Sequence, residues 1–169
     1  YLEYVPVPNR ILAEDAESER IYRYSGYSDV VVMKKIWRLD YLESIEPEEH
    51  PHVALIAPGL HDGLPMMRVM QERIKRQNDT QFIVKPHPLA SIDYLEEFAD
   101  LQNLEVSDES IEELLSRVSQ IFVTYSSVGP EAKQLGLKIN VINIPGYINE
   151  SSLIPQNGTM VSTDLVTIG

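Results

Sequence analysis

From His52 onward, short apolar stretches alternate regularly with stretches of helical character. The apolar stretches are rich in Val, Ile and Phe, which is typical of strands covered on both faces. The intervening stretches carry apolar residues at helical spacing, as Met66, Met70 and Ile74 do. Strands that alternate with helices form a parallel sheet with right-handed crossovers. The pattern therefore predicts an α/β fold, a doubly wound parallel sheet of Rossmann-like type, from His52 to the C-terminus.

The boundaries of these elements can be estimated from their capping and turn residues. Ser110 and Glu113 form a capping-box pattern that opens one helix, and Gly136 suits the end of another. The expected helices are 65–77, 92–98, one that starts at Ser110 and one that starts at Pro130. The expected strands are 53–57, 82–85, 104–106, 121–125 and 139–144, with a last short strand at 160–163.

The first 45 residues have a different character. A charged helical stretch at 14–25 lies between two short apolar stretches at 10–13 and 29–33. Residues 34–43 fit either a helix or a linker. The polar string from Glu46 to Pro51 carries two prolines, which is typical of a break between domains. We therefore expect one domain boundary there, with residues 1–45 before it and a domain at 52–169 after it.

Two motifs are expected at the carboxyl ends of strands. In IFVTYSSVGPEAKQLGL, from Ile121 to Leu137, a buried strand leads through Ser126 and Ser127 into a helix. Such a turn offers backbone N–H groups, the positive end of a helix dipole and two hydroxyls to an anion, although Ser and Gly are common in any turn of this kind. In QFIVKPHP, two prolines stiffen the chain where it leaves a strand.

The second motif presents a lysine and a histidine, Lys85 and His87, beyond the strand end. In open α/β sheets, ligands bind outside the carboxyl ends of the strands. The two motifs together therefore provide the chemistry that holds a phosphate or a diphosphate. The alternatives are a histidine in a turn exposed to water and a lysine that only screens the strand end.

The combination of VKPHP and YSSVGPEA resembles the nucleotide-binding half of GT-B glycosyltransferases. It is most similar to bacterial branches with an HP motif and a paired-serine motif. These are CMP-sialic-acid-using sialyltransferases, CDP-glycerol glycerophosphotransferases and transferases of capsule or surface carbohydrates. The serine turn is also similar to that of bacterial UDP-GlcNAc 2-epimerases. The resemblance covers residues from about His52 to the C-terminus, and residues 1–45 resemble the tail of the preceding domain and its linker.

The resemblance implies a role for each motif residue. His87 would be the catalytic residue, because it would offset charge on the leaving nucleotide. Glu131 would accept hydrogen bonds from a ribose, although an acid in a first helical turn is also favoured by the helix dipole alone. The nucleotide- and phosphate-binding residues would be Lys85, Ser126, Ser127, Gly129 and Glu131.

Two further loops are weaker candidates for the site. Gly59 and Gly63 flank the first loop of the domain, and Tyr147 follows the last long strand, where it could line a base or sugar pocket. His61 and Asp62 could pair or bind a metal, but a lone His-Asp dipeptide is more often part of a solvated loop. No Walker lysine, zinc spacing, GxSxG motif or Asp-x-Asp motif is present. We therefore expect no metal and no cofactor beyond the nucleotide-linked substrate.

Composition limits the other possibilities. The 169 residues carry a formal net charge of −12 and no basic stripe, which argues against a nucleic acid partner. The sequence contains no cysteine and no apolar run long enough to span a membrane. These features fit a cytoplasmic location, with association at the inner face of the membrane only through other parts of a longer chain.

We expect a donor-nucleotide-binding domain of a glycosyltransferase that builds a bacterial surface polysaccharide from a CMP-, CDP- or UDP-linked donor. The partners would be a nucleotide-activated sugar or polyol and a carbohydrate acceptor on a preceding domain. This piece of chain alone would then be inactive. The alternatives are a UDP-sugar 2-epimerase-like enzyme of the same fold and a non-enzymatic doubly wound α/β module.

Overall fold

A computed structural model of the protein describes residues 7–34, 37–46, 50–149, 151, 153 and 166–168. The chain divides into two compact units, Tyr1–Asp40 and Tyr41–Gly169. This division lies slightly ahead of the proline-bearing break at 46–51. The assignment of the two parts to two domains of a larger fold stays a prediction.

The first unit is a small β–α–β arrangement. Strands β1 (Ile11–Ala13) and β2 (Val30–Val32) pair in parallel, and helix α1 (Ala16–Tyr24) connects them. Asp15 caps the helix, because its carboxylate accepts a hydrogen bond from the backbone N–H of Ser18 at 2.7 Å. In the stretch 34–43, for which the sequence left two possibilities, the 3-10 helix η2 (Trp37–Ser44) begins, and it ends one residue beyond that stretch.

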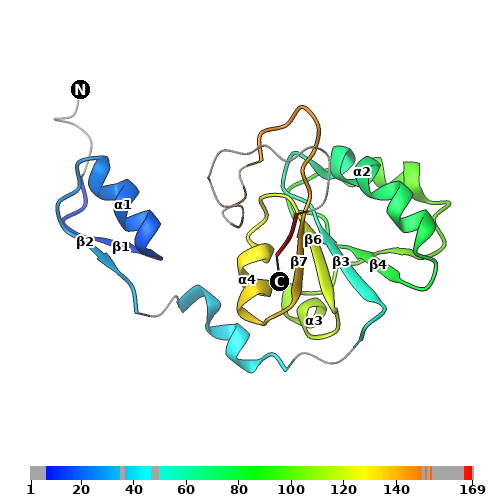
Figure 1. Ribbon diagram of the computed structural model, residues 1–169, viewed down its shortest axis with the longest axis horizontal. Helices are drawn as coiled ribbons and strands as arrows, with labels where there is room; N and C mark the ends of the chain where they lie inside the picture. The colour runs from blue at the N-terminus through cyan, green and yellow to red at the C-terminus, as the bar shows by residue number, and fades with distance from the viewer. Residues whose placement is uncertain are drawn as a thin grey trace. The chain divides into compact units, whose positions relative to one another are not determined.

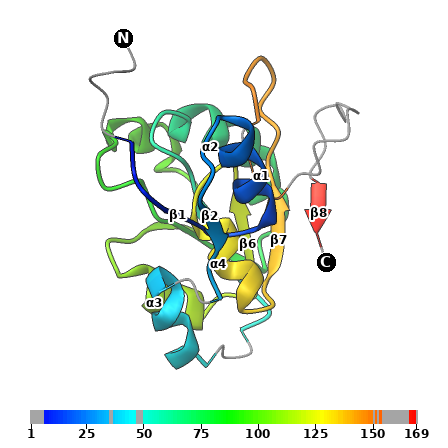
Figure 2. The same ribbon diagram turned by 90° about the vertical axis from the view of Figure 1, so that its left-hand side faces the viewer.

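The second unit contains a mostly parallel sheet with the strand order β5-β4-β3-β6-β7-β8 (Figure 1). The first five strands in this order are mutually parallel, and β8 pairs antiparallel with β7 at the edge (Figure 2). This architecture confirms the predicted α/β doubly wound parallel sheet. The strands are β3 (Val53–Ala57), β4 (Gln81–Val84), β5 (Leu104–Val106), β6 (Gln120–Val123), β7 (Lys138–Val141) and β8 (Val166–Ile168). The predicted strand at 160–163 lies outside the described residues.

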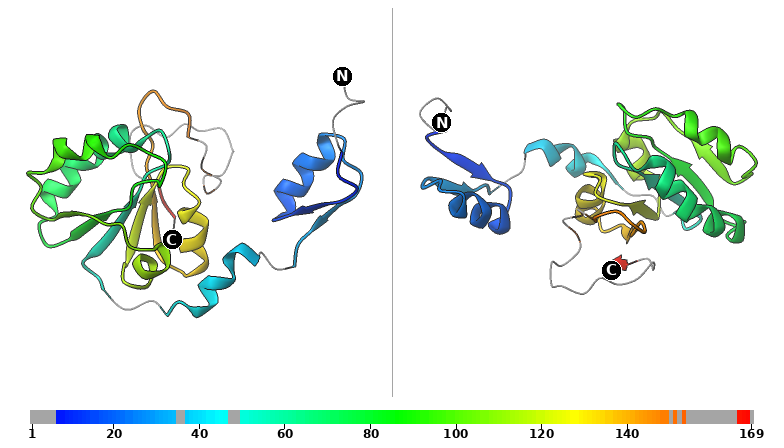
Figure 3. Two further views of the ribbon diagram at one scale, coloured as in Figure 1. Left: turned by 180° about the vertical axis from the view of Figure 1, so that it is seen from behind. Right: turned by 90° about the horizontal axis from the view of Figure 1, so that it is seen from above.

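Helices cover both faces of this sheet. In Figure 1, and from behind in Figure 3, the strands run between α2 (Gly63–Arg76) on one side and α4 (Val128–Gln134) on the other. The 3-10 helix η3 (Asp93–Phe98) packs with α2, and α3 (Ile111–Ser116) belongs to the crossover from β5 back to β6. A right-handed crossover in that direction lies on the face opposite α2.

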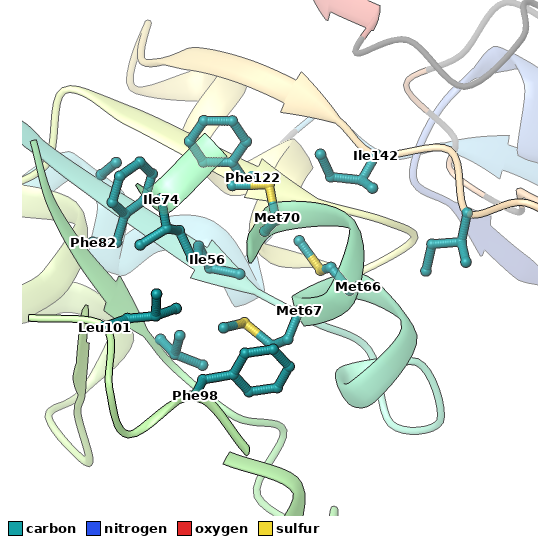
Figure 4. Packing of buried hydrophobic residues seen from close by; sticks show 13 residues of the cluster. Ile56, Met66, Met67, Met70, Ile74, Phe82, Phe98, Leu101, Phe122 and Ile142 are labelled. Atoms are coloured by element: carbon teal, nitrogen blue, oxygen red, sulfur yellow. The ribbon is translucent and has the colours of Figure 1, made fainter. Parts of the chain in front are cut away.

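The main hydrophobic core lies between α2 and the sheet. Residues alternate between the two faces along a strand, so Ala54 and Ile56 of β3 face this core. Figure 4 shows the fully buried Met66, Met70 and Ile74 of α2 packed toward the aromatic side chains of the sheet. The rings of Phe82 and Phe122 lie 6.0 Å apart between their centroids. This packing fixes α2, and therefore the loop that leads into it, against the centre of the sheet.

Some helix ends agree with the sequence, whereas the starts of α2 and α4 differ from it. Helix α2 begins at Gly63, two positions before the predicted start at residue 65. The capping box at Ser110 and Glu113 is present, and Gly136 follows α4 with φ 73°. Helix α4, however, begins at Val128, two positions before Pro130, with Ser127 as its N-cap residue. The expectation that Pro130 starts the helix was wrong, because the whole first turn lacks intrahelical N–H partners and accepts proline at any of its positions.

Candidate functional site

The carboxyl ends of the central strands bring four loops to one edge of the sheet. The pairing register aligns the end of β3 with the ends of its two neighbours, since Ile56 lies opposite Val84 and Ala57 opposite Val123. From β3 the chain moves outward to β4 and β5 and then returns to β6 on the other side. The point between β3 and β6 is therefore a topological switch point, where ligands of doubly wound folds bind.

Lys85 and His87 line one cavity of about 500 Å³ at this edge. The cavity lies between the proline-rich segment after β4 and the end of β5, where Ser107 and Asp108 form its opposite wall. The Lys85 ammonium donates a hydrogen bond to the backbone carbonyl of Asp108, with a distance of 3.1 Å between nitrogen and oxygen. This bond places a positive charge inside the wall of the cavity.

His87 is held in a defined orientation. Its Nδ1 atom accepts a hydrogen bond from the backbone N–H of Leu89 at 3.2 Å, while Pro86 and Pro88 restrict the backbone on both sides. A neutral imidazole that accepts at Nδ1 carries its hydrogen on Nε2. His87 therefore offers an Nε2–H donor from a half-buried position in the cavity wall.

The serine turn and the segment that contains His87 do not follow neighbouring strands of the sheet. His87 follows β4 and Ser126 follows β6, and β3 lies between these two strands. The Ser126 hydroxyl accepts a hydrogen bond from the N–H of Val128 at 3.4 Å, and Ser127 is exposed with no side-chain cap bond. Neither serine lines the cavity of Lys85 and His87 or either of the two other cavities at this edge of the sheet. A ligand that contacts both motifs would have to lie across the end of β3.

Gly129 and Glu131 are both buried on α4. A side chain at Gly129 would come within 2.7 Å of Leu153 and 3.3 Å of Val123, so this glycine allows the helix to approach the sheet closely. Glu131 is 8% exposed and is engaged in an interaction within the protein. The carboxylate therefore does not project freely over the edge of the sheet. Its proposed contact with a ribose stays a prediction.

A second cavity, of about 630 Å³, lies at the N-terminus of α2. It contains two of the predicted loop residues, Gly63 and Tyr147, and it shares Ala90 with the cavity of Lys85 and His87. Gly59 does not line it. A Cβ atom at Gly59 would meet the ring of Tyr125 at 2.5 Å, so this glycine makes room for the loop after β6.

The structure also reveals polar groups that the sequence did not single out as a site. Asp62 and Thr124 are buried beside a small cavity of about 20 Å³ at the switch point. Among the residues that the structure describes, neither Asp62 oxygen has a hydrogen-bond partner, and the same holds for the hydroxyls of Thr124 and Tyr94. Burial raises the pKa of the Tyr94 phenol, and the nearby negative charge of Asp62 raises it further.

The sequence contained a partial signal for this group. Asp62 was considered as a partner of His61 or as a metal ligand, but His61 is exposed while Asp62 is buried. Thr124 resembles any other β-branched residue of a strand. Within the described part of the chain, no three His, Asp or Glu side chains gather in a way that could hold a metal ion.

These observations define a class of protein: a doubly wound α/β domain with polar cavities beyond the carboxyl ends of its strands. No family model and no curated protein matches the sequence. Among solved structures, the chain is similar to the beta Kdo 2,7 transferase KpsC of Thermosulfurimonas dismutans.

The similarity to this transferase is limited. The two proteins share 17% sequence identity at a TM-score of 0.41, over 61% of this chain and 38% of the other. The chain thus matches well under half of that protein's length. A likeness at this level carries no argument about activity. No helix in the described part of the chain is both long and apolar enough to cross a membrane.

Proposed function

We propose that this chain is the donor-nucleotide-binding domain of a GT-B-type glycosyltransferase that takes a CMP-, CDP- or UDP-linked donor in surface polysaccharide biosynthesis. The observation that carries the proposal is the cavity lined by Lys85 and His87 beyond the carboxyl end of β4. Its volume of about 500 Å³ falls within the range of small-molecule sites. A cation and an N–H donor are the groups that a phosphate requires.

His87 would act on the leaving group. Its Nε2–H would donate to a phosphate oxygen of the nucleotide, because Nδ1 is already occupied by the N–H of Leu89. Negative charge increases on that phosphate as the glycosidic bond breaks, so a donor positioned in advance stabilises the transition state more than the ground state. Lys85, which lines the same cavity, would add a positive charge.

The serine turn would bind the part of the nucleotide that lies across the end of β3. Strands in a sheet are about 4.8 Å apart, so the ends of β4 and β6 are separated by roughly 10 Å. A nucleoside diphosphate is long enough to span that distance, whereas a single phosphate group is not. The acceptor would bind to another domain of a longer chain, and residues 1–169 alone would bind the nucleotide without turning it over.

A panel of nucleotides tests the proposal by thermal shift. CMP, CDP and UDP at millimolar concentration should raise the melting temperature of the wild-type chain, whereas NAD should not. A ligand present at 100 times its dissociation constant adds about 2.7 kcal/mol to the free energy of unfolding. A response to UDP alone would narrow the donor to a UDP-linked sugar, the class that the epimerase-like alternative also uses.

The matched control for this experiment is His52→Ala. His52 is exposed and lies at the beginning of β3, at the opposite edge of the sheet from His87. The His52 variant should respond to nucleotides as the wild type does, and His87→Ala should lose most of the response. If no pyrimidine nucleotide shifts the melting temperature of the wild type, the proposal is wrong.

A further inference from the structure

The strongest unexplained feature is the group of buried oxygens around the start of α2. Asp62 is 3% exposed and Thr124 is 5% exposed, yet their side-chain oxygens find no hydrogen-bond partner in the described part of the chain. Buried polar atoms in native proteins are nearly always paired, and a buried carboxylate is the costliest one to leave alone. Unpaired groups of this kind indicate that a partner beyond the described residues completes them.

The position of Asp62 does not provide its carboxylate with a hydrogen-bond partner. It is the N-cap residue of α2, a helix of 14 residues, where an aspartate usually accepts a hydrogen bond from the first turn. Its side chain makes no such bond. The carboxylate instead lines the small cavity together with Thr124, which follows the last residue of β6. The two residues thus line one cavity at the switch point between β3 and β6.

The surroundings of this pair suit a hydroxyl-rich ligand. The small cavity has about 20 Å³, enough for one water molecule or one hydroxyl group. It shares Ile144 and Tyr147 with the cavity of about 630 Å³, so a ligand in the larger cavity could extend one polar group toward Asp62. The exposed ring of Tyr147 offers a flat apolar face beside it.

The chemistry of the pair narrows the ligand further. An anion would be repelled by the Asp62 carboxylate, and an apolar group would leave both side chains unpaired. A divalent cation prefers several oxygen ligands of which more than one is charged, and this pair supplies one carboxylate. A carboxylate accepts two hydrogen bonds and a threonine hydroxyl can both donate and accept.

We propose that Asp62 and Thr124 form a subsite that binds hydroxyl groups of a sugar or polyol. The inference deepens the proposed function, on which it rests for the class of ligand. The hydroxyl groups have two possible sources: the ribose of the nucleotide and the sugar or polyol that it carries. Both sources share the chemistry that the subsite recognises.

The test uses saturation-transfer NMR with free ligands on the whole chain, so it does not require nucleotide binding. One arm contains glycerol, glucose, N-acetylglucosamine and N-acetylneuraminic acid. The other arm compares cytidine and uridine with their 2′,3′-dideoxy analogues. Wild-type protein should bind members of one arm, which identifies the source. A loss of binding on removal of the two ribose hydroxyls would assign the subsite to the nucleotide.

Two nearly isosteric variants establish where the ligand binds. Asp62→Asn and Thr124→Val should each weaken the binding of that ligand at least tenfold, because the first replaces one carboxylate acceptor with an amide donor and the second removes the hydroxyl. Neither change opens a cavity. Asp79→Asn is the matched control: it removes the same charge from an exposed acid that precedes β4, at the other edge of the sheet. Binding by this control should equal that of the wild type.

Melting temperatures of the variants show whether a loss of ligand binding comes from the subsite or from a loss of stability. Asp62→Asn should melt at or above the wild-type temperature in the absence of ligand, because it removes an unpaired buried charge. The inference is overturned if no hydroxyl-bearing ligand binds to the wild type, or if both variants bind as well as the wild type does. If Asp62→Asn does not fold, Thr124→Val alone decides between these results. Failure of the nucleotide panel together with loss of sugar binding in the variants would overturn the proposed function and leave the subsite standing.

Discussion

At the scale of single residues, the site depends on where two side chains direct their hydrogen-bonding atoms. His87 accepts a hydrogen bond from the N–H of Leu89 at Nδ1 and leaves Nε2–H for a ligand. Lys85 is fixed by the carbonyl of Asp108 in the same cavity wall. A phosphate is recognised by such positioned donors, whereas a nucleoside makes little use of them. The two kinds of ligand should therefore respond differently to changes at His87.

Isothermal titration of His87→Ala measures this difference. Loss of a hydrogen bond to a charged group costs about 1.5–3 kcal/mol, which corresponds to a reduction of nucleotide affinity by roughly 10- to 150-fold. Binding of the matching nucleoside should change by less than twofold. Glu131→Ala should weaken nucleoside and nucleotide equally if the ribose contact exists. An equal loss of both ligands in His87→Ala would mean that this side chain shapes the pocket without meeting phosphate.

At the scale of secondary-structure elements, α3 illustrates how local charges fix a helix that supports the sheet. Ser110 and Glu113 exchange hydrogen bonds at its N-terminus. The backbone N–H of Ser110, and then its hydroxyl, donate to the Glu113 carboxylate and hold its pKa below the ordinary value of 4.5. A carboxylate with a lowered pKa in the folded state stabilises the protein above pH 4.5. That contribution is lost as the pH falls through the folded-state pKa.

Glu113→Ala should therefore be less stable than the wild type at neutral pH. The difference in the free energy of unfolding should shrink below pH 4.5 and vanish at still lower pH, where the wild-type carboxyl is protonated as well. Urea denaturation between pH 3 and pH 7 measures both proteins. A difference that stays constant across this range would mean that the charge of the Glu113 carboxylate does not contribute to the cap.

The elements also show what the sequence could and could not predict. Strands β3 and β5 have the predicted boundaries, because apolar β-branched runs with clear turns around them leave few alternatives. Strand β6 ends at Val123, earlier than predicted, since the next residues leave the ladder and Tyr125 covers Gly59. The stiff segment around His87 was predictable because a proline restricts its own backbone and that of the preceding residue, whatever the rest of the fold.

The arrangement of the site depended on information that is not local. The strand order places β3 between the two motifs, and nothing in either motif specifies that order. Asp62 and Thr124 share a cavity with residues from the loop after β7, far away in the sequence. Sequence patterns thus predicted the edge of the sheet at which the site lies, but not which side chains share a cavity.

At the scale of the whole molecule, the protein itself supplies the positive charge that a phosphate needs. The net charge is −12, yet a lysine and an N–H donor meet in the cavity proposed for phosphate. We therefore expect nucleotide binding without a metal ion. Addition of EDTA should leave the dissociation constant of the nucleotide unchanged, and added magnesium should change it by less than threefold. Loss of binding in EDTA with recovery in magnesium would assign the phosphate contacts to a metal.

The central claim is that a pyrimidine nucleotide binds across the carboxyl ends of β4, β3 and β6. The most direct test is a backbone-assigned ¹H–¹⁵N NMR titration of the chain with CMP, CDP or UDP. The largest shift changes should fall on residues 85–89 and 124–128, with smaller ones around Asp62. Residues at the opposite edge, such as His52 and Asp79, should not respond. Shifts that cluster at that opposite edge, or that leave 85–89 unaffected while the nucleotide binds, would contradict the account.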